Sequence, residues 1–314
     1  MPFDAMHLAA LVVFGHIVLP IVMLGWLAST RAADRLTVAG IVLFVGALLL
    51  RVWLSGPGAA WLGPGWSWLY AAVFLASTAR QARRARSLPW RPARDTRPMI
   101  ECGVALGLAA FMTQSLAPIV LAMRTPERTV PLVFPLNDGR YRVLHGGSGE
   151  ALNQHAAVQA QRYALDIVAV NGWGMRASGL VPEDPHAYAI FGRPVHAPCS
   201  GRVLAVHDGE PDQTPPETDP SRPAGNHVVL ACPSGTVLLA HLAGGSIGVR
   251  IDQAVSAGDR LGRVGNSGNS TEPHLHIHAM EGDVRDPAAW LAAARPLAMT
   301  FDGRFLLRGD VVER

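Results

Sequence analysis

Long apolar runs dominate the first third of the chain. They cover His7–Leu27, Leu36–Leu54, Trp61–Ser77 and Met99–Met123. Each run approaches the roughly 20 residues that a helix needs to cross a bilayer. The pattern predicts an α-helical membrane domain over residues 1–124 with about four transmembrane helices. Gly63 and Pro64 interrupt the third run, so a re-entrant or interfacial segment is the alternative there.

The arginines between these runs predict how the helices are oriented. The first link carries Arg31 and Arg35. The link between the third and fourth runs carries Arg80, Arg83, Arg84, Arg86, Arg91, Arg94 and Arg97. Basic residues gather in cytoplasmic loops of membrane proteins. We therefore expect a multi-pass protein of the cytoplasmic (inner) membrane whose C-terminal domain lies on the extracytoplasmic side.

Beyond residue 124 the pattern changes to short alternating runs separated by Gly and Pro turns. Residues 125–150 read as a linker and a first strand, residues 151–295 as a second domain, and residues 296–314 as a C-terminal tail. Further strands are expected at Arg162–Val170, Gly201–Val206, Asn226–Cys232 and Thr236–Leu242. A short helix is expected at Trp290–Arg295. Short strands with glycine turns and little helix predict a mostly β domain.

The segment His274-Leu-His-Ile-His278 carries the strongest chemical signal. A strand has a period of two, so the three imidazoles share one face, and Leu275 and Ile277 share the other. Imidazole is the commonest metal-binding side chain in proteins. The pattern favours a metal site on this strand; a histidine cluster on a solvated strand is the alternative.

Two further polar residues lie on or at the end of apolar strands. Asp166 lies inside one predicted strand, and His241 lies near the end of another. A buried carboxylate needs a partner, which a metal or an arginine would supply. Nitrogen and oxygen donors of this kind suit Zn²⁺, which keeps three protein ligands and one water in catalytic sites.

The charge of the chain limits its possible binding partners, and its cysteines bear on the cellular compartment. The net charge is only +3, and no basic stripe with interleaved aromatic residues is present, which argues against nucleic-acid binding. Cys199 and Cys232 lie beside turns of the β domain. If that domain is extracytoplasmic they could form a disulfide; two free thiols are the alternative. Cys102 lies in an apolar run and is expected to be buried.

Four ordered motifs resemble the M23 peptidases, the zinc endopeptidases of the LytM and lysostaphin type that cut peptide cross-bridges or stems in peptidoglycan. The motifs are Gly192–Val203, Leu239–Leu242, Val255–Gly268 and Pro273–His276. The resemblance covers roughly residues 166 to 280. It implies a mainly antiparallel β fold with a groove across the sheet, a Zn²⁺ cofactor, and a peptide substrate.

The resemblance also implies roles for individual residues. Asp166 and His276 match the metal ligands, and His241 and His274 match the catalytic pair. The family usually has His four residues before the ligand Asp, where this chain has Arg162. An arginine stays protonated and cannot bind zinc. Either another histidine supplies the third ligand or the site is degenerate. His155 is the first candidate because it lies just upstream, in the polar stretch Leu152-Asn-Gln-His155, and His278 is the second.

Two functions follow from these expectations. The first is a membrane-anchored zinc metalloendopeptidase acting on peptidoglycan or a related peptide outside the cytoplasmic membrane. The alternative is a catalytically degenerate module that binds cell wall or regulates a partner hydrolase, which Arg162 motivates. A zinc-dependent esterase or amidase using the same site is a minor third possibility.

Overall fold

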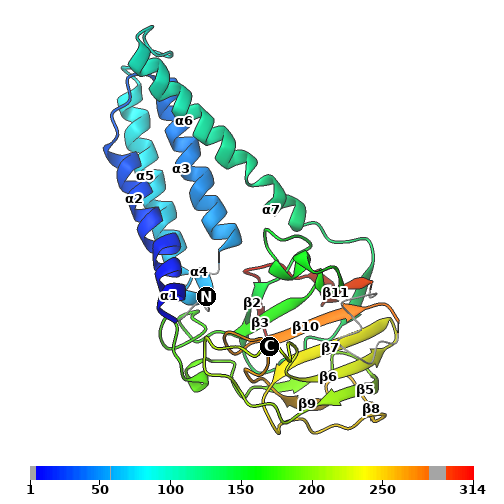
Figure 1. Ribbon diagram of the computed structural model, residues 1–314. Helices are drawn as coiled ribbons and strands as arrows, with labels where there is room; N and C mark the ends of the chain where they lie inside the picture. Colours follow the sequence, from blue (N-terminus) through cyan, green and yellow to red (C-terminus); the bar gives the residue numbers. More distant parts are fainter. Residues whose placement is uncertain (1–4, 57, 283–294) are drawn as a thin grey trace. The chain divides into compact units, whose positions relative to one another are not determined.

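The computed structural model describes residues 5–56, 58–282 and 295–314. The chain forms two compact units. One comprises Ala10–Val120, and the other comprises Leu121–Arg314 together with Met1–Ala9. The first consists of helices and the second is built mainly from β-strands (Figure 1). The expected architecture of N-terminal apolar helices followed by a mainly antiparallel β domain is confirmed.

Among the described residues up to 122, the regular structure is helical. The helices are α1 (Ala5–Val13), the π-helical turn η1 (Phe14–Val18), α2 (Leu19–Ser29), α3 (Arg35–Ser55), α4 (Gly58–Trp61), α5 (Gly65–Ala85), α6 (Thr96–Gln114) and α7 (Ala117–Ala122). Asp34 caps α3, because its Oδ1 accepts a hydrogen bond from the backbone N–H of Thr37 at 2.9 Å. α5 begins only after Gly63 and Pro64, the residues that interrupt the third apolar run.

Three segments of the described chain are long and apolar enough to cross a membrane. These are Ala9–Ser29, Arg35–Ser55 and Thr96–Ala122. α5 is as long as α3 but is not among them; it carries Arg80, Arg83 and Arg84 toward its C-terminal end. Large apolar side chains are exposed on the helices of this unit, including Trp68 (72 %) and Leu75 (65 %) on α5. Exposed apolar side chains in such numbers mark a surface that contacts lipid or protein.

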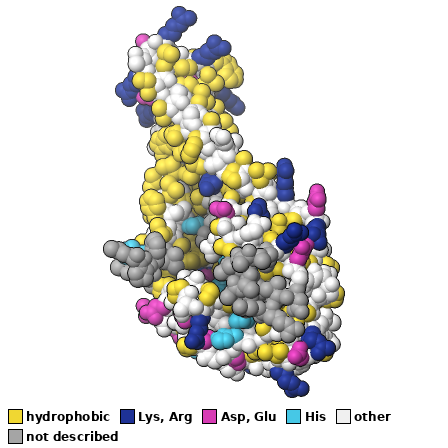
Figure 2. Space-filling view, turned by 45° about the vertical axis from the view of Figure 1, so that its right-hand side comes forward, with side chains coloured by type: hydrophobic (Ala, Val, Ile, Leu, Met, Phe, Trp, Pro, Cys, Tyr) yellow, Lys and Arg dark blue, Asp and Glu magenta, His cyan; other side chains and the backbone are white. Residues whose placement is uncertain are grey.

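The two arginine-rich links lie at the same end of the helical unit. The backbone N–H of Arg35 donates to the carbonyl of Pro89 at 2.9 Å, and the Arg35 side chain donates to the carbonyl of Leu88. Its guanidinium also lies over the ring of Trp90. Figure 2 shows the basic side chains gathered at this end, with mostly apolar side chains along the helices below them.

The second unit is built on one large sheet. Its strands are β1 (Thr129–Leu132), β2 (Arg140–His145), β3 (Leu165–Ala169), β5 (Gly201–His207), β6 (Asn226–Cys232), β7 (Gly235–Leu242), β8 (Ala254–Val255), β10 (Leu275–Met280), β11 (Pro296–Phe301), β12 (Arg304–Phe305) and β13 (Val311–Glu313). The main path runs β13-β2-β3-β10-β7-β6-β5-β8. β4 (Pro194–His196) and β9 (Arg260–Arg263) pair separately. The described pairings are antiparallel, apart from β1 with β11.

The ends of several elements differ from the pattern-based expectations. β3 begins at Leu165, because residues Gln159–Gln161 form a 3₁₀ turn before it. Residues 296–314, set apart above as a tail, supply β11, β12 and β13 to the sheet. The helix expected at Trp290–Arg295 falls on residues 290–294, which lie outside the described part of the chain.

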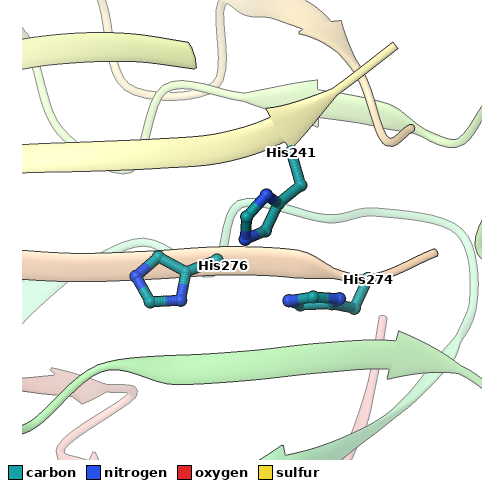
Figure 3. A group of neighbouring side chains, drawn as sticks. All are labelled: His241, His274 and His276. Carbon is teal, nitrogen blue, oxygen red and sulfur yellow. The ribbon is translucent and has the colours of Figure 1, made fainter. Parts of the chain in front are cut away.

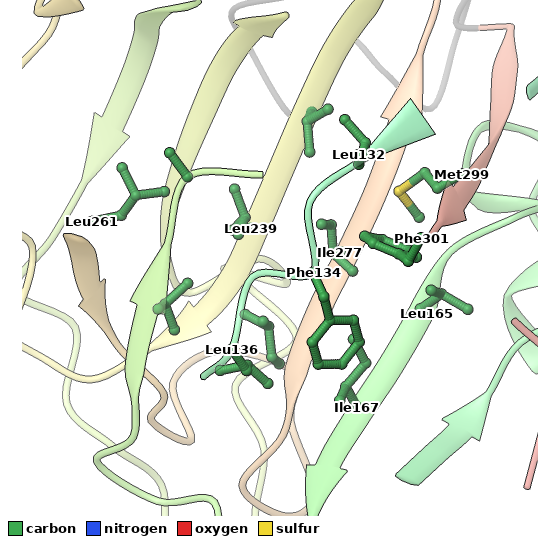
Figure 4. Close-up of a cluster of buried hydrophobic side chains, with 14 of the residues drawn as sticks. Leu132, Phe134, Leu136, Leu165, Ile167, Leu239, Leu261, Ile277, Met299 and Phe301 are labelled. Carbon is green, nitrogen blue, oxygen red and sulfur yellow. The ribbon is translucent and has the colours of Figure 1, made fainter. Parts of the chain in front are cut away.

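One face of the sheet carries the hydrophobic core. Ile167, Leu239 and Ile277 are fully buried there, and Phe134 and Leu136 pack onto them from the segment after β1 (Figure 4). Leu275 and Ile277 point into this core, so the predicted alternation along β10 is confirmed. Fully burying one such side chain contributes about 1.5–3 kcal/mol.

The structure pairs Cys199 with Cys232 in a disulfide, with their Cα atoms 5.9 Å apart. Cys102 is a free, buried thiol on α6, as expected from its apolar surroundings. The disulfide joins the turn before β5 to the end of β6. It therefore ties together two segments of the β unit that lie 33 residues apart.

Candidate metal centre

Asp166 lies at the centre of a histidine cluster. It is 5 % exposed on β3 and stands directly opposite His276 of β10 in the antiparallel register. His276 Nδ1 lies 2.9 Å from Asp166 Oδ1, and His155 Nε2 lies 2.8 Å from Oδ2. Burial favours the protonated acid, but His155 and His274 outweigh it and hold the Asp166 pKa well below its usual value. The carboxylate is therefore ionised and can act as a ligand.

A buried asparagine fixes the short turn that carries His155. This residue lies in η2 (Gln154–Ala157), ahead of β3. Asn153 is fully buried, and its Nδ2 donates to the carbonyls of Gly147 and Ala164 at 3.1 and 2.9 Å. Its Oδ1 accepts from the backbone N–H of His155 at 3.2 Å. Asn153 thus ties the turn to the chain on both sides of it and brings His155 to Asp166.

Arg162 occupies the position where the resemblance expects a ligand histidine. It follows η3 (Gln159–Gln161) and contributes its carbonyl, which accepts from Asn153 Nδ2 at 3.3 Å. The imidazole beside Asp166 comes instead from His155, eleven residues earlier. The polar stretch before β3 was the only sequence signal for this replacement.

His241 and His274 complete the cluster from the other side (Figure 3). His241 lies near the C-terminal end of β7 with φ of 61°, and its Nδ1–H donates to the carbonyl of Ser267 at 2.9 Å. His274 precedes β10, and its Nδ1–H donates to the carbonyl of Glu272 at 2.8 Å. A carbonyl oxygen can only accept, so in both neutral rings Nε2 carries the lone pair. The two ring centroids lie 4.8 Å apart.

Burial controls the protonation of His241. It lowers the His241 pKa well below the usual value, and the neighbouring His274 and His276 lower it further. For His274 burial acts in the same direction, but the Asp166 carboxylate outweighs it and raises the pKa of His274. The pKa of His241 is thus lowered and that of His274 is raised, although both rings donate to backbone carbonyls.

The turn Gly265–Thr271 aims His241 as well as His274. Ser267 Oγ donates to the carbonyl of Leu242 and accepts from the backbone N–H of Asn226. Gly268 has φ of +76°, and a Cβ there would lie 2.4 Å from the backbone nitrogen of Gly225. Only glycine fits this close approach. The turn therefore fixes the carbonyl of Ser267, to which His241 donates.

A buried ion pair supports the carbonyl that holds His274. Arg176 is 1 % exposed, and its Nε donates to both carboxylate oxygens of Glu272 at 2.9 Å. Its guanidinium also lies over the ring of Tyr188, and burial raises the pKa of that phenol. The pair fixes residue 272, two positions before His274. Because 96 residues separate the partners, no sequence pattern pointed to it.

His278, the second candidate for the third ligand, contacts His276. Its Nδ1 lies 2.8 Å from His276 Nε2, on the side of that ring away from Asp166. A metal ligand commonly uses its second ring nitrogen in such a bond, which fixes the orientation of the ring. The geometry therefore favours His155 over His278 as the donor beside Asp166.

One histidine was missed at the sequence level. His145 ends β2, and its Nδ1 lies 3.4 Å from Asp166 Oδ2. Burial lowers the pKa of His145 to about 3, with Asp166 opposing this effect and Arg308 adding to it. The ring is therefore neutral at physiological pH. Its place after an alternating strand and before two glycines carried no metal-site signal.

The donor set fits a zinc ion. Ligand atoms of His241, His274 and His276 lie within 4.8 Å of one another, and so do those of His145, His155 and Asp166. Both groups adjoin the same carboxylate. His145 Nδ1 is buried without a hydrogen-bond partner among the described residues. Imidazole nitrogens with one carboxylate are donors that zinc prefers.

The cluster borders a groove of about 780 Å³ on the face of the sheet opposite the core. His155, His241 and His276 line one part of it, and Leu238 and Ala240 lie beside them. His207 and Arg222 line it as well, the latter from the loop after β5. A molecule lying in this groove would reach the histidines directly.

Part of the β unit matches a known protein family, and several solved structures are similar to part of this chain. Residues 187–287 match the model of Peptidase family M23. Among solved structures, a zinc-containing peptidase from Vibrio cholerae is 21 % identical, with 46 % of this chain and 35 % of that chain covered and a TM-score of 0.29. A putative M23 peptidase from Pseudomonas aeruginosa is 22 % identical over 57 % and 60 % of the two chains, with a TM-score of 0.29.

The catalytic domain of lysostaphin from Staphylococcus simulans is 26 % identical over 33 % of this chain and 73 % of that chain, with a TM-score of 0.23. This chain thus spans about a third of the Vibrio protein and less than two thirds of the Pseudomonas protein. The family match identifies a Peptidase family M23 domain in this chain. It includes His241, His274 and His276, whereas His155 and Asp166 join them through the fold.

Proposed function

We propose that the chain is a membrane-anchored zinc metalloendopeptidase that hydrolyses peptide bonds in peptidoglycan cross-bridges or stem peptides. The observation that carries this proposal is the arrangement around Asp166. His155 and His276 lie against its two oxygens, and His241 and His274 lie beside them with Nδ1 held by backbone carbonyls; His274 Nε2 lies 3.5 Å from Asp166 Oδ1. This supplies a metal ligand set and a catalytic pair around one carboxylate, beside a groove that His155, His241 and His276 line.

In this proposal His155 Nε2, Asp166 and His276 Nδ1 hold the zinc ion. Zinc bound there would act as a Lewis acid on the scissile carbonyl and lower the pKa of a water molecule. With zinc on His276 Nδ1, the proton of that ring would lie on Nε2, which would donate to His278 Nδ1, 2.8 Å away. The second nitrogen of the ligand ring is thereby fixed.

His241 and His274 move the protons. The carbonyls of Ser267 and Glu272 hold the Nδ1–H groups, so each Nε2 is available to take a proton from the attacking water. A ring protonated at Nε2 can then donate a hydrogen bond to the oxyanion of the tetrahedral intermediate, or return its proton to the leaving amine. Such a group contributes about 10²–10⁴-fold to the rate.

The groove suits an extended peptide. Gln154, Gln161 and Asn269 line it and can bond to backbone amides, while Leu238 and Ala240 give it an apolar part. The M23 match supports a peptide as substrate. Peptidoglycan is the substrate class that the resemblance implies, and the zinc cofactor is proposed on the same grounds together with the donor set.

Two observations support an extracytoplasmic position for the β unit. Both arginine-rich links lie at one end of the helical unit, as expected if that end faces the cytoplasm. Cys199 and Cys232 are paired, and disulfides persist in oxidising compartments outside the cytoplasm. The domain bounds that we propose are those of the sequence pattern. The membrane anchor comprises residues 1–124, the linker and first strand 125–150, the peptidase domain 151–295, and the C-terminal segment 296–314.

The test uses the full chain purified in detergent. Its zinc content is measured by mass spectrometry of the metal, and its activity by the soluble peptides released from purified peptidoglycan. We expect about one zinc per chain and release of cross-bridge or stem fragments. A chain that takes up no zinc when zinc is supplied, and releases no peptide, would overturn the proposal.

The alternative is a non-catalytic module that binds cell wall or regulates a hydrolase. Arg162 at the usual ligand position is the observation in its favour. It predicts that the chain sediments with peptidoglycan but releases nothing from it, and that His274→Ala leaves cellular function intact. The position of His155 beside Asp166 weighs against it, because the missing imidazole is replaced.

A further inference from the structure

A local irregularity in β2 places His145 opposite Asp166. In the β2–β3 pairing Tyr141 faces Ala169, Arg142 faces Val168 and Val143 faces Ile167. A regular ladder would next place Leu144 opposite Asp166, but the register shifts and His145 takes that place. β-Bulges of this kind re-aim a side chain and are frequent beside active sites. The extra residue therefore exchanges an apolar neighbour of the carboxylate for an imidazole.

The contact that His145 makes is not a hydrogen bond. Its Nδ1 lies 3.4 Å from Asp166 Oδ2, beyond the 2.7–3.2 Å usual for such bonds. Oδ2 already lies 2.8 Å from His155 Nε2. His145 Nδ1 is buried and has no hydrogen-bond partner among the described residues. A buried polar atom without a partner is unfavourable, so a partner is to be expected.

The separation matches two ligands of one metal ion. Zinc binds nitrogen and oxygen at about 2.0–2.2 Å with tetrahedral angles, which sets two donors about 3.4 Å apart. The ligand atoms of His145, His155 and Asp166 all lie within 4.8 Å of one another. An ion bound to His155 and Asp166 would therefore have the Nδ1 lone pair of His145 within reach.

We infer that His145 is a fourth protein ligand of the metal centre, beside His155, Asp166 and His276. The inference rests on the zinc centre of the proposed function and extends it. Four protein ligands make a tighter centre than three, and water then enters by expansion to five ligands, which catalytic zinc sites allow. The bulge in β2 is what makes this possible, because Leu144 could supply no donor.

The test measures zinc binding directly, with the full chain in detergent. The metal-free wild type, His145→Ala and the control His186→Ala are titrated with zinc against a chromogenic chelator. His186 is a suitable control because its side chain is 77 % exposed. We expect the dissociation constant of His145→Ala to rise at least tenfold and that of His186→Ala to be unchanged.

Counting the histidine ligands separates a metal ligand from a residue that only orients Asp166. X-ray absorption of the zinc-loaded chains should give three imidazoles in the wild type and two in His145→Ala. His145→Asn keeps a polar side chain that can hydrogen-bond Asp166, and we expect it to bind zinc as weakly as His145→Ala does. The thermal transitions of the metal-free chains show whether each variant is folded.

The outcomes distinguish this inference from the function on which it rests. Equal affinity and equal imidazole counts in wild type and His145→Ala would overturn the inference alone. Restoration of wild-type affinity by His145→Asn would overturn it too, because that would make His145 an orienting residue. A wild-type chain that binds no zinc would overturn the proposed function together with the inference.

Discussion

The two faces of β10 are equally buried but have different partners. Leu275 and Ile277 are fully buried in the hydrophobic core, where their partners are other apolar side chains. His276 and His278 are 4 % and 1 % exposed on the opposite face, where they contact Asp166 and each other. Burying apolar surface stabilises the fold, whereas burying imidazoles opposes it unless each is bonded. The core face of β10, with Leu275 and Ile277, thus stabilises the fold, whereas the chemical face, with His276 and His278, contributes to the candidate metal centre.

The largest effect should come from the chemical face, at His241. His241→Ala removes the Nε2 that faces the cluster, while the carbonyl of Ser267 that held the ring can turn to water or to a neighbouring N–H. We expect the rate of peptide release to fall about 10²–10⁴-fold, because a proton-transferring group is lost. Zinc content should stay near the wild-type value, since the proposed ligands are untouched. The rate is measured by mass spectrometry of released fragments.

His186→Ala is the matched control for that experiment, because it removes an exposed histidine that lies just before the family-matched region. Its rate should equal that of the wild type. If His241→Ala also lost its zinc, His241 would be a ligand and the division into ligand set and catalytic pair would be wrong. A rate within tenfold of the wild type would exclude His241 from proton transfer.

The next effect concerns stability, on the core face. Ile277→Ala removes buried methylene and methyl groups from a fully packed position and should lower the free energy of unfolding of the β unit by about 2–5 kcal/mol. Pulse proteolysis of the full chain in detergent across a urea series measures it. The zinc affinity of the molecules that remain folded should be unchanged, because Ile277 points away from Asp166.

Val133→Ala, in the segment after β1, is the control, since Val133 is 52 % exposed and little packing is lost. Its free energy of unfolding should stay within about 0.5 kcal/mol of the wild type. Should Ile277→Ala instead weaken zinc binding while leaving stability unchanged, the separation between the two faces would not hold.

Local sequence patterns predicted the two faces of β10, but they did not predict contacts between residues that are distant in sequence. The period of two in His274–His278 was sufficient to place Leu275 and Ile277 in the core. The apolar runs likewise predicted the long N-terminal helices, although the arginines in α5 leave three segments that qualify as spans. Such signals are local, because they depend only on neighbours along one element.

The rest of the site depends on how separate elements meet. Arg176 and Glu272 lie 96 residues apart, and nothing near either one marks it as half of a buried pair. His145 reaches Asp166 only because β2 gains a residue against β3, and strand patterns do not reveal bulges. His155 was predicted only after the resemblance exposed Arg162 as unable to bind metal. The family match itself begins after Asp166, so the fold has to supply that half of the cluster.

The smallest effect should come from His278. It lies on the histidine face of β10 but contacts His276 rather than Asp166. His276 can direct Nδ1 at the metal only while Nε2–H has an acceptor, and His278 Nδ1 supplies it at 2.8 Å. His278→Leu removes the acceptor and keeps the volume, so zinc should bind about 10–100-fold more weakly. His278→Asn restores an acceptor oxygen and should recover part of this loss. Chelator competition on the full chain measures both variants. If His278→Leu and His278→Asn bound zinc equally, packing rather than the hydrogen bond would set the orientation of His276. The histidine face of β10 would then depend on side-chain packing, as the core face does.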